Sequence, residues 1–160
     1  MYETKNDLQM KVRTTIISLL QDRLADCIDL MNQGKQAHWN VKGPSFFALH
    51  ELFDKVSEET EEYVDLIAER LVQLGGIAEG TIQAVAKRST LPEYPLDISK
   101  GSEHVARFSH ALAYFGELAR RAIDQANEIR DADTADIFTE ISRGVDKWLW
   151  MVEAHNQAKE

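Results

Sequence analysis

Apolar residues recur every three or four positions through most of the chain, and no stretch alternates as a strand would. Residues at this spacing share one face of a helix. The pattern predicts four long helices, over about 7–40, 45–74, 99–129 and 134–156. Asn6 or Asp7 could cap the first. Gly75 and Gly76 end the second, and 131–134 supplies turn and cap residues before the fourth.

A long connection over 77–98 separates the second and third helices. A short helix near 81–86 fits within it, whereas Pro92 and Pro95 impose an extended or turn conformation on the segment around them. We therefore expect an all-α fold, a four-helix bundle with one long crossover that contains a short helix. This arrangement resembles the ferritin-like bundle, where a connection of that length is normal.

Composition fits one globular domain over 1–160, with a short N-terminal tail of about 1–6. The 160 residues are 44% hydrophobic and 28% charged, with a net charge of −9. An acidic surface attracts cations and repels nucleic acid. Cys27 has no disulfide partner and is expected to be a buried apolar residue, a reactive thiol being the alternative. The early apolar run 16–20 is too short for a signal or a membrane span, so we expect a cytoplasmic protein without a membrane partner.

Five residues carry the candidate chemistry: His38, His50, Asp54, Asp65 and Glu69. The pairs 50/54 and 65/69 are each four residues apart, which places their members on one helix face. The eleven residues between the two aspartates make about three turns with roughly 20° left over, so the two pairs are in phase. Imidazoles and carboxylates on one face form a ligand set that iron, zinc or manganese accepts.

One helix cannot close a single site with both pairs. Asp54 and Asp65 stand about 16 Å apart along the axis, and metal–ligand bonds are near 2 Å. A second copy running antiparallel across a two-fold axis would bring His50 and Asp54 of one chain to the other chain's acidic pair. That contact makes two equivalent sites at once. The axis would cross the helix near Glu59 and Thr60.

Each of these residues also has a structural interpretation. A lone histidine such as His38 is more often a hydrogen-bonded structural residue than a ligand. The carboxylates could form a solvated face with partners such as Lys55 or Arg70. The helix is acidic on all sides, so carboxylates alone are weak evidence for a metal site. The histidines are the residues that favour a metal site over a solvated face. The chain contains no Glu-x-x-His pair, which di-iron bundles place in their own core, and this agrees with an inter-subunit site.

The ordered pattern His-x11-His-x3-Asp-x10-Asp-x3-Glu resembles that of the Dps mini-ferritins, the DNA-binding proteins from starved cells. The resemblance spans nearly the whole chain from about residue 8, through 35–40, 49–54, 65–70, 73–76, 94–98, 133–137 and 146–150. It implies a hollow shell of twelve subunits, with ferroxidase sites at two-fold interfaces. There His38, His50 and Asp54 would serve with the mate's Asp65 and Glu69. Ferrous iron would be oxidised, preferably by hydrogen peroxide, and stored as ferric mineral, which limits oxidative damage.

The resemblance also implies roles for three further residues. Trp39 matches a tryptophan beside the site that intercepts radicals, with an aromatic interface filler as the alternative. Asp136 and Asp146 match acidic residues of three-fold pores through which ferrous ions pass, although caps or salt-bridge partners are alternatives. Cavity-facing carboxylates could nucleate mineral, or could simply be solvated; these are Glu51, Glu58 and Glu62.

DNA binding is where the chain departs from the family pattern. Lys5 is the only base before Lys11, and 156–160 is not a basic tail either. Without clustered cations, little counterion release drives binding, so DNA binding is expected to be weak or absent. Two rival functions remain open: a DNA-compacting nucleoid protein with secondary metal binding, and a helical scaffold whose interface holds structural zinc. Zinc could also compete with iron for the same ligands.

Overall fold

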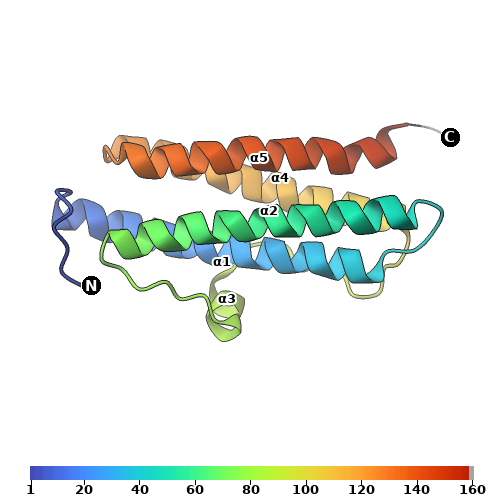
Figure 1. Ribbon diagram of the computed structural model, residues 1–160, viewed down its shortest axis with the longest axis horizontal. Coiled ribbons are helices and arrows are strands. Elements are labelled where there is room, and N and C mark those ends of the chain that lie inside the picture. The colour runs from blue at the N-terminus through green and yellow to red at the C-terminus, as the bar shows by residue number, and fades with distance from the viewer. Residues whose placement is uncertain (159–160) are drawn as a thin grey trace.

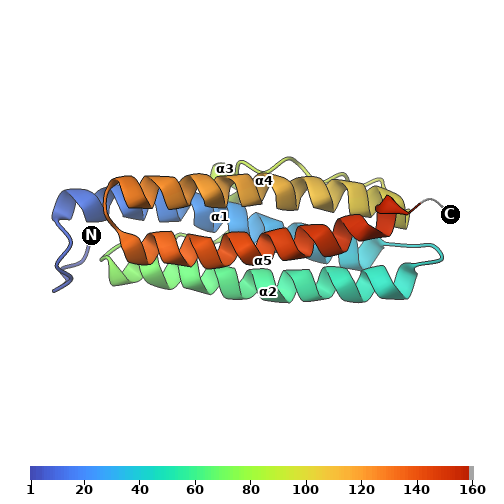
Figure 2. The same ribbon diagram turned by 90° about the horizontal axis from the view of Figure 1, so that it is seen from above.

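The computed structural model describes residues 1–158 and contains, within them, five helices and no strand. Their bounds are α1 Met10–Asn40, α2 Phe46–Gln73, α3 Ile82–Arg88, α4 Gly101–Glu128 and α5 Ala132–Gln157. The four long helices form a bundle of two antiparallel pairs, with α1 packed along α2 and α4 along α5 (Figure 1). The crossover that carries α3 runs back along the length of the bundle, so that α4 starts at the end where α1 stops (Figures 1 and 2). The predicted all-α bundle with its short crossover helix is confirmed.

The helices α1 and α4 begin later than predicted. Side chains or neighbouring segments form hydrogen bonds there with backbone groups that would otherwise have joined the helix. The Asn6 side chain accepts a hydrogen bond from the backbone N–H of Leu8 (3.0 Å), which holds a turn there, and α1 begins only at Met10. The prediction that Asn6 or Asp7 caps α1 is therefore wrong. Local bonds of this kind compete with helix formation.

The start of α4 is delayed by a contact with the α1–α2 turn. The N–H of Lys42 donates to the carbonyl of Ser99 (2.8 Å), and the N–H of Gly101 donates to that of Lys42 (3.1 Å). The helix therefore begins at Gly101. At the other end of the bundle, Asp131 caps α5 by accepting from the N–H of Thr134 (3.1 Å), inside the segment where the sequence predicts cap residues.

The core is continuous along the bundle and is built by the predicted helical faces. Its largest fully buried side chains are Phe53, Phe108, Phe115, Phe138, Ile16, Leu20, Leu24, Leu30, Ile67, Leu71, Leu74 and Leu112. Cys27 is also fully buried, and burial raises the pKa of its thiol above the usual range. The expected buried, unreactive cysteine is what the structure contains.

Three carboxylates of α1 hold the crossover against the bundle. Asp22 pairs with Arg88 (2.9 Å), and Asp29 accepts from the hydroxyl of Ser89 (2.6 Å). The fully buried Asp26 accepts from both the backbone N–H and the hydroxyl of Thr90 (2.7 and 3.0 Å). These bonds fix a segment that lacks a long helix of its own.

The N-terminal residues lie against the end of α2. The N–H of Tyr2 donates to the carbonyl of Gly75 (2.8 Å), and the Arg13 guanidinium donates to the carbonyl of Leu74 (3.3 Å). Gly75 has φ +91°, and a Cβ there would lie 2.6 Å from the carbonyl oxygen of Tyr2, so only glycine fits. Across residues 1–158, none of the helices combines the length and the apolar character that crossing a bilayer requires.

Candidate metal centre

Two histidines meet where α1 passes into α2. His38 lies in the last turn of α1 and His50 in the first turns of α2. Their rings stack with centroids 3.7 Å apart and planes inclined by 19°. The Nδ1 atom of His38 lies 2.7 Å from the carbonyl oxygen of His50, and Nδ1 of His50 lies 2.9 Å from the carbonyl oxygen of His38.

These reciprocal bonds select the tautomer of both rings. A carbonyl oxygen only accepts, so each Nδ1 must carry the proton and donate it. In a neutral imidazole the Nε2 atom then keeps its lone pair, which is the form that binds a metal. A backbone carbonyl bonded to the other ring nitrogen is the usual way in which a metal-binding histidine is oriented. Both rings are therefore prepared as ligands.

Asp54, one turn after His50, adds a carboxylate to this group. One of its oxygens lies 3.9 Å from Nδ1 of His38, and the Lys35 ammonium forms an ion pair with the same oxygen. The hydrogen bond from Lys35, together with the charge of its ammonium, lowers the pKa of Asp54. The carboxylate is therefore ionised at neutral pH and available to a cation.

Lys35 is a site residue that the sequence reasoning missed. Its side chain is 35% exposed and that of Asp54 is 30% exposed, so the pair is only partly shielded from water. The available signal was its position three residues before His38, on the same face of α1. An incoming metal ion would have to displace its ammonium from Asp54.

The acidic pair lies farther along α2, apart from the histidines. Asp65 and Glu69 line a hollow of about 450 Å³ whose other lining residues are Glu59, Glu62, Tyr63, Leu66 and Glu140. Neither Asp65 nor Glu69 forms an ion pair with any side chain of residues 1–158. The hollow is thus a concentration of negative charge without a matching cation.

The single chain does not bring the five predicted ligands together. Among the described residues, no three histidine, cysteine or acidic side chains are close enough to hold a metal ion. The chain has instead a histidine group of His38, His50 and Asp54 and a separate acidic group of Asp65 and Glu69. Because α2 is one unbroken helix between them, folding within the chain cannot close the gap.

The predicted crossing point of two chains needs one correction. Thr60 is 1% exposed, and its hydroxyl donates to the carbonyl of Val56 (2.7 Å). Its side chain belongs to the chain's own core and cannot supply a contact to a second copy. Glu59, the other residue at that level, is exposed. That a two-fold axis crosses α2 at this level stays a prediction.

Trp39 follows the first histidine and is 69% exposed in the single chain. Phe46 and Phe47, at the start of α2, are also exposed, at 44% and 73%. Large apolar side chains around a ligand group are typical of a surface that another molecule covers. Both proposed roles of Trp39, radical trap and interface filler, are compatible with this placement.

The two predicted pore residues lie on α5 and are both exposed. Asp146 pairs with Arg120 of α4, whose guanidinium contacts both carboxylate oxygens (3.0 and 3.2 Å) and also lies 3.4 Å from the hydroxyl of Ser142. Within the single chain, Asp146 thus adopts the salt-bridged alternative. The candidate mineral-nucleating residues Glu51, Glu58 and Glu62 are exposed as well.

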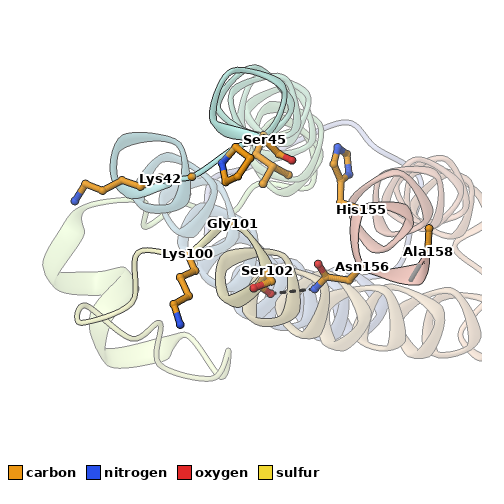
Figure 3. Close-up of a pocket in the computed structure, with 11 residues that line it drawn as sticks. Lys42, Ser45, Lys100, Gly101, Ser102, His155, Asn156 and Ala158 are labelled. Atoms are coloured by element: carbon orange, nitrogen blue, oxygen red, sulfur yellow. Dashed lines mark hydrogen bonds between the residues drawn. The ribbon is translucent and has the colours of Figure 1, made fainter. Parts of the chain in front are cut away.

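A larger hollow, of about 630 Å³, lies at the end of the bundle near the histidine group but uses none of the five ligands. It is bounded by the α1–α2 turn, the start of α4 and the end of α5 (Figure 3). The side chains of Lys42 and Lys100 extend away from the other lining residues in Figure 3. The Asn156 amide donates to the carbonyl of Ser102 (3.0 Å). The lysines therefore do not form a cradle for an anion.

Comparison with known proteins agrees with the architecture. The ferritin family model, described as a ferritin-like domain, matches residues 17–159. A DNA protection during starvation protein of Agrobacterium fabrum is 46% identical over 158 residues, 99% of this chain and 98% of that protein. One from Brevibacillus brevis is 31% identical over 92% of this chain and 98% of its own length. The structure of Mycobacterium smegmatis Dps in its tetragonal form superposes with a TM-score of 0.93 at 29% identity, covering 99% of this chain and 95% of that one.

Proposed function

Because this chain belongs to the Dps family of ferritin-like proteins, we propose that it is a ferroxidase that oxidises ferrous iron and stores the ferric product. The observation that carries the proposal is the reciprocal bonding of His38 and His50, which leaves both Nε2 atoms free beside an ionised carboxylate. Imidazole nitrogen loads ferrous iron, and hard carboxylate oxygen favours the ferric product. Iron is here the substrate and the cargo.

The complete site is formed by two chains. One chain supplies His38, His50 and Asp54, and its mate supplies Asp65 and Glu69 across an antiparallel contact of two α2 helices. Neither group alone offers enough ligands, and the unbroken α2 keeps them apart in each chain. Because a two-fold contact is self-complementary, each dimer carries two such sites. We further propose that these dimers assemble into a dodecameric shell that encloses the mineral.

The oxidant is hydrogen peroxide in preference to dioxygen. A site with few protein ligands leaves open positions on the iron for a small oxidant. Reduction of one peroxide by two ferrous ions yields water and ferric iron without releasing hydroxyl radical. Protection from oxidative damage then follows from removing both reactants at once. Zinc, which accepts the same histidine and carboxylate ligands, would act as a competitor.

Ferrous iron reaches the interior at three-fold contacts. Both acidic pore candidates, Asp136 and Asp146, are exposed on α5 as this role requires, and Asp146 would have to exchange its ion pair with Arg120 for a passing ion. We propose that the mineral forms within the shell and that the protein acts in the cytoplasm. Trp39, exposed beside His38, would intercept radicals that escape the site.

Direct DNA compaction is the second candidate function, and the names of the relatives from Agrobacterium fabrum and Brevibacillus brevis refer to DNA protection. The net charge of −9 argues against it. So does the N-terminal segment, because Tyr2 is bonded to Gly75 and the segment lies on the protein body. Protection would then come from iron and peroxide removal. The last two residues of the C-terminal stretch, 159 and 160, lie outside the described residues.

Mixing two inactive variants tests the shared site. His50→Ala and Asp65→Ala chains each lack one half-site and should not oxidise iron rapidly when assembled alone. Unfolded together and co-assembled, they regenerate intact sites where a normal histidine group meets a normal acidic group, about a quarter of all sites for random pairing. Stopped-flow iron oxidation with peroxide measures the recovery.

The matched control replaces Asp65→Ala by the double variant His50→Ala/Asp65→Ala. Its mixture with His50→Ala contains no normal histidine group, so it should recover no activity. If the first mixture also remains inactive although native mass shows co-assembly, the site does not lie between chains. Full activity in either single variant would show that these residues are not the ligands.

A further inference from the structure

A buried tyrosine lies beside the acidic group and has no part in the proposed site. Tyr63 is 4% exposed, and it lines the same hollow as Asp65 and Glu69. It precedes Asp65 by about 3 Å of helix rise and Glu69 by about 9 Å. The hollow that its side chain lines is therefore the one bounded by the carboxylates that would hold one side of the iron site.

The phenol is held by two specific neighbours. Its hydroxyl donates to a carboxylate oxygen of Glu59 at 3.1 Å. On α5, Gly144 leaves room for it, since a Cβ at that position would lie 1.8 Å from the phenol oxygen. A core filler needs only a hydrogen-bond acceptor, whereas this phenol has a carboxylate that can take its proton.

We propose that Tyr63 donates one electron to the oxidation of iron when the neighbouring site holds a single ferrous ion. This inference rests on the proposed ferroxidase function and adds a residue to it. Reduction of hydrogen peroxide to two waters takes two electrons and two protons, and one ferrous ion supplies only one electron. Tyr63 supplies the other electron and becomes a neutral phenoxyl radical.

The step balances in atoms and charge. The O–O bond of peroxide breaks and the phenol O–H bond breaks. The phenol proton passes to Glu59 and on to an oxygen of the oxidant, and the second proton comes from solvent. The products are ferric iron, two waters and the Tyr63 radical. A later ferrous ion, with one proton, reduces the radical back to the phenol. Hydroxyl radical is therefore not released at a half-filled site.

Tyr63 differs from Trp39, the other aromatic residue considered at the site, in its position and its exposure to solvent. Trp39 is 69% exposed and follows His38 in the histidine group, so a radical there meets solvent. Tyr63 is enclosed between α2 and α5, is only 4% exposed, and borders the hollow of the acidic group. An oxidising equivalent held on Tyr63 is shielded from other molecules until more iron arrives.

The test uses the assembled protein, loaded without oxygen with one ferrous ion per site and then mixed with hydrogen peroxide. Freeze-quenched samples are examined by electron paramagnetic resonance, in protein made with ordinary and with ring-deuterated tyrosine. We expect a radical signal that narrows with the deuterated label. Tyr63→Phe should lose it and should raise the hydroxyl adduct of a nitrone spin trap. Tyr114→Phe, a partly buried tyrosine of α4, is the matched control and should keep the signal.

Glu59→Gln tests the carboxylate's role in a chain that retains Tyr63. The amide oxygen accepts the same hydrogen bond but takes up a proton poorly, so the radical should form more slowly. An unchanged tyrosine signal in Tyr63→Phe would overturn the assignment. So would rapid iron oxidation by the unaltered protein without any tyrosine radical. A protein that fails to oxidise iron at all, followed by ferric absorbance, would instead refute the proposed function on which the assignment rests.

Discussion

Removal of the Lys35 charge should strengthen metal binding at the histidine group. In the structure its ammonium is paired with Asp54, so a metal ion must displace it before that carboxylate can serve as a ligand. Lys35→Gln removes this competitor while keeping a polar side chain of similar length. The variant should therefore bind a divalent cation more tightly than the unaltered protein.

The size of the effect follows from the exposure of the pair. With side chains 35% and 30% exposed, the pair is screened by water and contributes about 0.2–1 kcal/mol. This is the cost that the metal avoids in the variant, equivalent to about 1.4- to 5-fold tighter binding. Added salt weakens the ammonium–carboxylate attraction, so the gain should shrink as ionic strength rises.

The pH range of the effect is set by Asp54. Its pKa is lowered below the ordinary value of 3.8 by Lys35, so the folded state favours the ionised carboxylate. The stabilisation from the pair is then fully present above the ordinary pKa and is lost as pH falls through the lowered one. Around neutral pH both partners are charged, and the competition is at its full strength.

Zinc binding to the assembled protein, measured by competition with a chromophoric chelator, provides the assay. Lys55→Gln is the control, because it makes the same change in net charge on the exposed side of α2, next to Asp54 in sequence. If both variants gain equally, the general field of the protein accounts for the result. Unchanged or weaker binding in Lys35→Gln would refute the displacement argument.

Three further predictions concern stability and DNA. Arg130→Gly should stabilise the protein by about 0.5–1 kcal/mol in chemical denaturation, because Arg130 has φ +63° at the end of α4, a conformation that glycine adopts without strain. Asp26→Ala should cost about 3–5 kcal/mol and speed amide exchange at Thr90, since it leaves the Arg23 charge without its partner; exchange as slow as in the unaltered protein would contradict the anchoring role. A gel-shift assay at low salt should show no saturable retention of duplex DNA by the assembled protein.

Helical periodicity alone was enough to predict the four long helices. Apolar positions such as Ile16, Leu20 and Leu24 recur every four residues, and all are fully buried in the structure. The stop after α2 was also readable, because Gly75 needs a positive φ. These features depend on neighbours within a few residues, and such information lies in any short window of sequence.

The contacts that the sequence did not reveal join residues far apart in the chain. The hydroxyl of Tyr63 lies against Gly144, and the sequence around either residue does not predict this contact. Likewise, Asp26 holds Thr90 through a pairing that depends on where the crossover lands on α1. The Lys35–Asp54 pair depends on how tightly the α1–α2 turn folds back. Only the assembled bundle determines these distances.

The division of the ligands along one rigid helix has a consequence for how the chemistry is controlled. Each newly folded chain carries a histidine group with its own lysine counterion and an acidic group without one. In the single chain, Lys35 partly neutralises the histidine group. The acidic group can attract cations but has no imidazole to complete a redox site. Under the proposed arrangement, the two groups meet only when a second α2 docks antiparallel. Iron oxidation would then begin only in assembled protein, where the shell can store the ferric product. An unassembled chain would bind iron too weakly to start that reaction.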